Sequence, residues 1–144
     1  LDPALSVPYL AGLEEGGHAA AAARRGGVVD IIVADDPEST ARQLIPNLAH
    51  QQATYLNRRG DTRSAADLEI ELTAELDLTG SVPGLTVATP EVAAGEIRIR
   101  TRHMPVEHVY LWAGLPGMAD TLVDRHMELL FTRVAPALAE AAPC

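Results

Sequence analysis

The sequence predicts a single α/β domain of parallel βα units over residues 1–144. Two apolar, β-branched segments, at 28–34 and 106–112, alternate with longer segments of helical periodicity. In addition, a helix cap followed by proline and glutamate occurs at 36–38 and again at 89–91, each time shortly after a strand-like segment. Because alternating strands and helices are typical of parallel sheets, these observations favour the α/β class.

The N-terminal quarter predicts two helices before the first strand. Apolar side chains from Leu5 to Leu13 recur at helical spacing, and Gly16-Gly17 ends this helix. The alanine-rich segment 18–25 is also typical of a helix, and Gly26-Gly27 breaks the chain after it. Segment 28–34 is nearly continuous in apolar character, which indicates a strand buried on both faces.

A long helix is predicted next. Asp36 is a good N-cap, Pro37 suits the first helical position, and Arg58-Arg59-Gly60 is a typical helix end. The following stretch, 60–84, is treated as an irregular insert. Its residues 68–78 alternate with period two, which favours a strand, but they are mostly Leu, Glu and Ala, which favour a helix. We expect a helix there, and an extra hairpin is the alternative.

The C-terminal half repeats the strand–helix pattern. Segment 85–88 is short and strand-like, and a helix is expected from Pro90 to about Arg102, where His103-Met104-Pro105 ends it. After the strand 106–112 and a glycine-flanked loop, the chain closes with a helix that Pro136 and Pro143 end. Its apolar face consists of Met118, Leu122, Val123, Met127, Leu130, Phe131, Val134 and Leu138.

Composition and charge exclude several classes of function. The formal net charge is −9 and every basic residue is arginine, so binding to nucleic acid is not expected. No apolar run approaches the roughly 18 residues that cross a bilayer, and no signal peptide is visible, so no membrane association is expected. A single cysteine excludes a disulfide framework and favours a cytoplasmic location. Motifs for dinucleotides, nucleoside triphosphates and zinc are absent from the sequence.

Two long segments carry a resemblance to a known family. Residues 105–138, PVEHVYLWAGLPGMADTLVDRHMELLFTRVAPAL, look like the C-terminal end of luciferase-like flavin-dependent oxidoreductases. Residues 9–49, with EEGGH, ARRGG and VADDPESTARQLIPNLAHQ, resemble an earlier part, and TPEVA at 89–93 is similar to the cap before that family's penultimate helix. Most of the chain is covered.

The resemblance implies a (β/α)₈ barrel, of which this chain is the C-terminal half and therefore an incomplete barrel. It implies FMN or a deazaflavin coenzyme and hydride transfer or monooxygenation of a small organic substrate. The family's phosphate-binding loops and most of its N-terminal active-site residues lie upstream of the matched part. For that reason the resemblance assigns no catalytic residue to this chain.

The strand 106–112 supplies the first candidate site residues. Active sites of barrels gather at the C-terminal ends of the strands, and this strand ends on Trp112, the only tryptophan. Side chains alternate along a strand, so Val109 and Leu111 share a face suited to packing against helices. The other face carries His108, Tyr110 and Trp112. We take Tyr110 and Trp112 as candidates for a flavin or substrate pocket; a core aromatic at Trp112 is the alternative.

Further candidates follow the two strands. Gly114 and Leu115 lie in the loop after Trp112, where a pocket role competes with a plain tight turn before a helix. Asp35 ends the first strand and is a pocket candidate, whereas Asp36 is expected to cap a helix. None of the five histidines has metal-ligand spacing, and His126 is expected at the surface or in helix packing.

Two functions remain open from the sequence. The first is a portion of a flavin-dependent luciferase-like oxidoreductase or monooxygenase. The second is a non-catalytic half-barrel remnant or an α/β module that assembles with itself, for example as a homodimer, because an open half-barrel has exposed strand edges.

Overall fold

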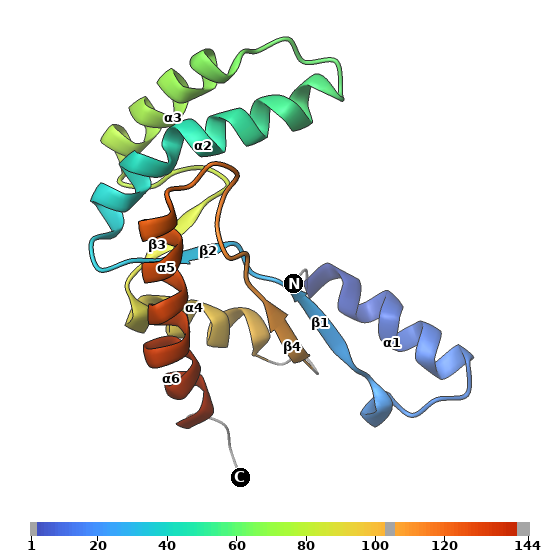
Figure 1. Ribbon diagram of the computed structural model, residues 1–144. Helices are drawn as coiled ribbons and strands as arrows, with labels where there is room; N and C mark the ends of the chain where they lie inside the picture. The colour runs from blue at the N-terminus through green and yellow to red at the C-terminus, as the bar shows by residue number, and fades with distance from the viewer. Residues whose placement is uncertain (1–2, 103–105, 141–144) are drawn as a thin grey trace.

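Strands and helices alternate along most of the chain, which a computed structural model describes for residues 3–102 and 106–140 (Figure 1). The strands are β1 (Arg25–Val28), β2 (Ile31–Val33), β3 (Thr86–Ala88) and β4 (Val106–Tyr110). The helices are α1 (Ser6–Glu15), α2 (Pro37–Asn57), α3 (Ala65–Thr79), α4 (Pro90–Thr101), α5 (Asp120–Leu129) and α6 (Ala135–Glu140). Two 3₁₀ turns, η1 (Pro3–Leu5) and η2 (Ala20–Ala22), and a π-helical turn, η3 (Leu130–Val134), complete the elements. No helix in these described parts is both long and apolar enough to cross a membrane.

The strands form two parallel pairs, which confirms the α/β class. β1 pairs with β4, with Gly26 opposite His108, and β2 pairs with β3, with Ile32 opposite Val87. The predicted strand 28–34 is therefore divided at Val29 and Asp30. The division lies where the chain changes its partner from β4 to β3.

The order of the strands is not that of a barrel. In a (β/α)₈ barrel each strand neighbours the next one along the chain, so β4 would lie beside β3. Among the described strands β4 pairs only with β1, and none joins β3 to β4. The incomplete barrel expected from the resemblance is thus not supported by these two sheets.

Gly26 and Gly27 lie inside β1 and do not break the chain as predicted. Glycine suits position 26 because the side chain of Tyr110 lies across the strand pair at that point. A Cβ atom on Gly26 would lie 3.1 Å from Cε2 of Tyr110 and 3.3 Å from the carbonyl oxygen of His108. Glycine in this strand therefore permits a close approach of its neighbour. The helix predicted over 18–25 is also wrong, since only the short turn η2 forms there.

The caps that begin α2 and α4 are confirmed. The carboxylate of Asp36 accepts a hydrogen bond from the N–H of Ser39 at 3.1 Å, and Pro37 is the first residue of α2. The Thr89 hydroxyl accepts from the N–H of Val92 at the start of α4. The predicted end of α4 at His103-Met104-Pro105 lies outside the described residues.

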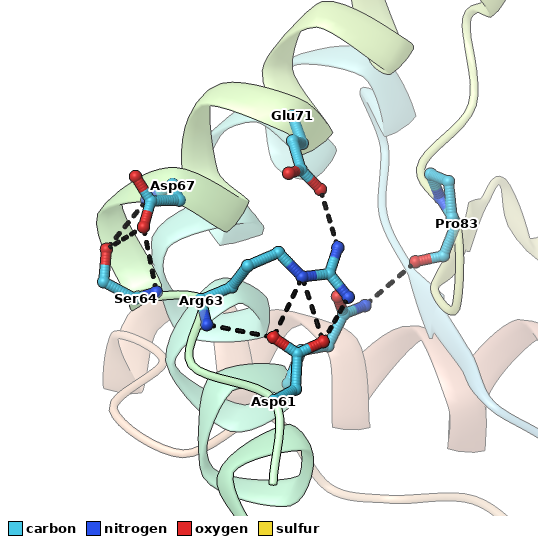
Figure 2. Close-up of polar contacts among 7 residues, drawn as sticks. Asp61, Arg63, Ser64, Asp67, Glu71 and Pro83 are labelled. Carbon is cyan, nitrogen blue, oxygen red and sulfur yellow. Dashed lines mark hydrogen bonds and ion pairs between the residues drawn. The ribbon is translucent and has the colours of Figure 1, made fainter.

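The stretch 60–84 is not an irregular insert, because most of it is the helix α3. Ser64 and Asp67 form a reciprocal capping box at its start, and Gly80 ends it with a φ of 72°. Figure 2 shows the ion pairs before the helix, where Arg63 contacts the carboxylates of both Asp61 and Glu71. The helix expected over 68–78 is confirmed, and the hairpin alternative is wrong.

Two hydrophobic clusters meet at β2. Ile32 belongs to a cluster between α2 and α3, whereas Ile31 and Val33 belong to a second cluster with α4 and the C-terminal helices. All three side chains are buried, so the prediction of a strand buried on both faces is confirmed for β2. β2 therefore contributes side chains to both hydrophobic clusters.

The closing helix does not end at Pro136. Proline has no N–H to donate to the carbonyl of Thr132 and interferes with regular α-helical packing there. The turn before it is wound as η3, and the helix continues through α6 to Glu140. Pro143 lies outside the described residues.

Candidate functional site

A cleft of about 610 Å³ lies where four segments of the chain meet. Its volume falls within the range of roughly 300–1,000 Å³ that small-molecule sites usually have. The segments are the start of β2, the middle of α2, the turn before β3 and the loop after β4. Lining side chains include Asp30, Leu48, Tyr55, Leu85, Trp112 and Leu115.

Trp112 forms one wall of this cleft. Its side chain is 62% exposed, so the alternative of a core aromatic is not what the structure shows. Side chains alternate along β4 and the two residues that follow it. Val109 and Leu111 pack against the second cluster, so Trp112 lies on the opposite face. The wall is therefore set by the neighbouring residues of the same strand.

The loop after β4 is a packed turn. The side-chain amide of Asn47 in α2 donates to the carbonyl of Pro116 at 3.0 Å, and Leu115 packs against the first cluster. A Cβ atom on Gly114 would lie 3.1 Å from both Sδ of Met118 and Cγ2 of Val123. Gly114 and Leu115 thus line the cleft from a segment that α2 and the following helix hold in place.

Tyr55 of α2 is a second aromatic residue in the cleft lining. The guanidinium of Arg58, one turn later, lies 6.0 Å from the centroid of the Tyr55 ring. This is within the range of a cation–π contact. Arg58 itself does not line the cleft, and no arginine does.

Tyr110 and Asp35 lie outside the cleft lining. The Tyr110 ring is 57% exposed, lies over Gly26 and has its centroid 6.4 Å from that of His108. Asp35 follows the other end of β2, where its two carboxylate oxygens accept from Nε and an Nη of Arg125 at 2.7 and 2.9 Å. These bonds hold the pKa of the Asp35 carboxyl below its ordinary value. Asp35 is therefore an ion-pair partner of α5 rather than a pocket residue.

His126 is the residue that sequence reasoning missed. It is fully buried, and its Nδ1 accepts a hydrogen bond from the N–H of Val33 at 2.9 Å. Its Nε2 lies 3.0 Å from the carbonyl oxygen of Trp112. Because Nδ1 is an acceptor, the proton of the neutral ring is on Nε2, which donates to Trp112. Burial lowers the pKa of the imidazole, which keeps it neutral.

A signal for His126 was present in the sequence. It lies four residues after Leu122 and three before Leu129, which is the spacing of side chains on one helix face. The buried residues of α5 are His126 and Leu129, so the buried face is rotated from the one predicted through Met127. No group of three or more potential metal ligands occurs in the described parts of the chain.

Comparison with known proteins gave no match to a family model, to a curated protein or to a solved structure.

Proposed function

We propose that this chain is a portion of a flavin-dependent, luciferase-like oxidoreductase or monooxygenase that acts on a small organic substrate. In this proposal it contributes one wall of the site that receives a planar ring. A cytoplasmic location belongs to the same proposal and is supported by the single cysteine. The observation that carries the proposal is the exposed Trp112 ring on a cleft that is otherwise largely apolar.

The cleft fits a flat, uncharged ring and does not fit a phosphate. Trp112 and Tyr55 offer aromatic faces, and Leu48, Leu85 and Leu115 add apolar surface. Among the described residues, Asp30 is the only carboxylate in the lining, and it is joined by no arginine. FMN and deazaflavin coenzymes both carry phosphate, so neither is held whole by these residues.

The role of the chain is therefore binding and orientation. A flavin would supply the hydride chemistry when bound. Trp112 and Tyr55 would stack on the ring, the leucines would exclude water from it, and the packed loop at Gly114 would limit its position. We assign no proton transfer to Asp30, because it is exposed at the start of β2.

The proposal also includes the barrel fold that the resemblance implies. In a complete barrel β4 would leave β1 and lie between β3 and the first strand of the upstream half. In that arrangement the loop after β4 would lie at the C-terminal end of its strand, whereas Asp30 and Leu85 precede β2 and β3, so the cleft described above depends on the pairing of β4 with β1.

Titration with two flavins tests the proposal. Riboflavin carries the ring without phosphate, and its binding is followed through the emission of Trp112, the only tryptophan. We expect riboflavin to quench this emission to saturation and FMN to bind no more tightly. Trp112→Leu, followed by the flavin's own anisotropy, should weaken binding by about fivefold, equivalent to about 1 kcal/mol of stacking.

Phe131→Leu is the matched control, because Phe131 is an exposed aromatic of η3 that does not line the cleft. It should leave the affinity for riboflavin unchanged. Absence of saturable quenching would refute the ring site. Tighter binding of FMN that is lost in Arg58→Ala would show that the site does accept phosphate.

A second candidate function is self-assembly through β4. No described strand pairs with the outer edge of β4. Two copies related by a two-fold axis would pair their β4 strands antiparallel and bury both edges. Sedimentation velocity tests this: we expect a dimer that Val109→Pro in β4 converts to a monomer, and a monomeric wild-type chain would exclude it.

A further inference from the structure

His126 joins three segments of the fold through its two ring nitrogens. It lies on α5, accepts from the backbone of β2 at Val33, and donates to the backbone after β4 at Trp112. The second of these bonds attaches the main chain of the cleft wall to the interior. The same wall is also held by the packing of Leu111 and Leu115 and by the hydrogen bond from Asn47 to the carbonyl of Pro116. His126 is thus the polar tie that positions Trp112.

We infer that His126 is a proton-sensitive lock: its neutral ring holds the carbonyl of Trp112 against β2 and α5, and acidification releases this wall of the cleft. The step is a proton transfer from solvent to Nδ1. Once Nδ1 carries a proton, it faces the N–H of Val33 with a second donor, so that hydrogen bond is lost. The ring must then move to find an acceptor, and its bond to Trp112 moves with it.

Burial supports this mechanism. The ring is fully enclosed, and desolvation is the largest cause that lowers its pKa, whereas the hydrogen bond to the carbonyl of Trp112 raises it. A charged imidazole at this place is therefore unfavourable unless the wall opens to water. Protonation of Nδ1 therefore disfavours the closed wall.

The ionisable groups on the surrounding elements are engaged elsewhere. Arg125 of α5 pairs with Asp35 and Glu128, and Arg133 of η3 pairs with Glu91 of α4. None of these groups, nor Tyr110 at the end of β4, contributes to the pKa of His126. The ionisable side chains on α4, α5, η3 and β4, together with those that flank β2, are Glu91, Glu96, Arg98, Arg100, Asp120, Asp124, Arg125, Glu128, Arg133, Glu107, His108, Tyr110, Asp30 and Asp35. The lock therefore responds to protonation of His126 itself.

Any effect of this release on the binding of a ring in the cleft rests on the proposed function, whereas the lock itself does not. We therefore test the lock on the free protein by the fluorescence anisotropy of Trp112, from about pH 8 to about pH 5, the range in which histidine titrates. We expect the anisotropy to fall with a midpoint below the ordinary histidine pKa of about 6.5, while far-ultraviolet circular dichroism stays constant. A flat anisotropy profile would overturn the inference.

Two substitutions separate positioning from folding. His126→Gln can place an amide N–H near the Trp112 carbonyl but does not titrate, so it should keep the high anisotropy and lose the transition. His126→Asn can accept from Val33 but does not reach Trp112, so its anisotropy should be low at every pH. His108→Gln is the matched control, since His108 is an exposed histidine of β4, and it should keep the wild-type transition. A transition that survives in His126→Gln would contradict the lock.

Hydrogen exchange gives a readout that needs no variant. The N–H of Val33 is protected by His126, whereas that of Ala34, the next residue, donates to the carbonyl of Ala88 at 2.9 Å. After correction for intrinsic rates, acidification should reduce the protection of Val33 at least tenfold relative to Ala34. Equal loss at both would refute the lock. A lock without any riboflavin binding would instead refute only the proposed function.

Discussion

The pairing of β1 with β4 can be tested by the coupling between Gly26 and Tyr110. Gly26→Ala introduces a Cβ atom 3.1 Å from Cε2 of Tyr110, where carbon atoms at optimal separation lie about 3.5–4.0 Å apart. The tyrosine ring must therefore rotate away from its preferred position, at a cost of about 0.5–1.5 kcal/mol. Without Tyr110, the contact with the His108 carbonyl oxygen at 3.3 Å remains, and it is opposed by the gain of about 0.4–1 kcal/mol that alanine brings by having fewer unfolded conformations.

A double-mutant cycle measures this coupling. Gly26→Ala, Tyr110→Ala and the double variant are unfolded with urea and followed by circular dichroism. We expect Gly26→Ala to be less favourable by about 0.5–1.5 kcal/mol with Tyr110 present than with alanine there. Gly95→Ala is the control, because nothing lies within 4 Å of a Cβ atom on Gly95 in α4. It should stabilise the protein and show no coupling to Tyr110.

Coupling below about 0.3 kcal/mol between positions 26 and 110 would refute the pairing. It would then favour the consecutive strand order of a barrel, in which these residues are not neighbours. The cycle therefore decides between the two strand orders without a ligand.

Two further predictions concern stability. Leu72→Ala should lower the free energy of unfolding in urea by about 2–5 kcal/mol, whereas Ile70→Ala should change this free energy by less than about 0.5 kcal/mol. The reason is that Leu72 and Ile70 of α3 are 5% and 71% exposed. Equal effects would indicate the period-two strand instead. The free energy of unfolding should also fall as the pH drops below about 6.5, because the unfolded chain takes up the His126 proton before the folded one. The slope can reach about 1.4 kcal/mol per pH unit, and a His126→Gln variant with an undiminished slope would show that another group is responsible.

Local signals in the sequence predicted much of the fold. Asp36 and Thr89 are caps whose hydrogen bonds are made within three residues, so neighbouring residues suffice to predict them. The burial of β2 on both faces also followed from its uninterrupted apolar character. The helix α3 was harder, because its apolar residues fit two periods, and the helical propensity of Leu, Glu and Ala decided between them.

Long-range contacts could not be predicted in the same way. Gly26 looks like a chain break until Tyr110, 84 positions later, is known to lie across it. The sequence leaves His126 open between a surface position and helix packing, and its burial becomes clear only when Val33 and Trp112 are brought to its two nitrogens. For the candidate site, strand alternation predicted that Trp112 lies on the face opposite Val109 and Leu111, whereas the pairing of Asp35 with Arg125 could not be predicted because the two are distant in the sequence.

The central claim is that the cleft beside Trp112 binds a planar ring. Mapping of amide chemical shifts in the labelled protein, with riboflavin added, tests it most directly. The account predicts shifts that cluster on the separate segments lining the cleft, at Asp30, Leu48, Tyr55 and Leu115, and that saturate together with the quenching of Trp112. Shifts confined to Tyr110 and Gly26, on the exposed face of β1 and β4, or no saturable shifts at all, would contradict it.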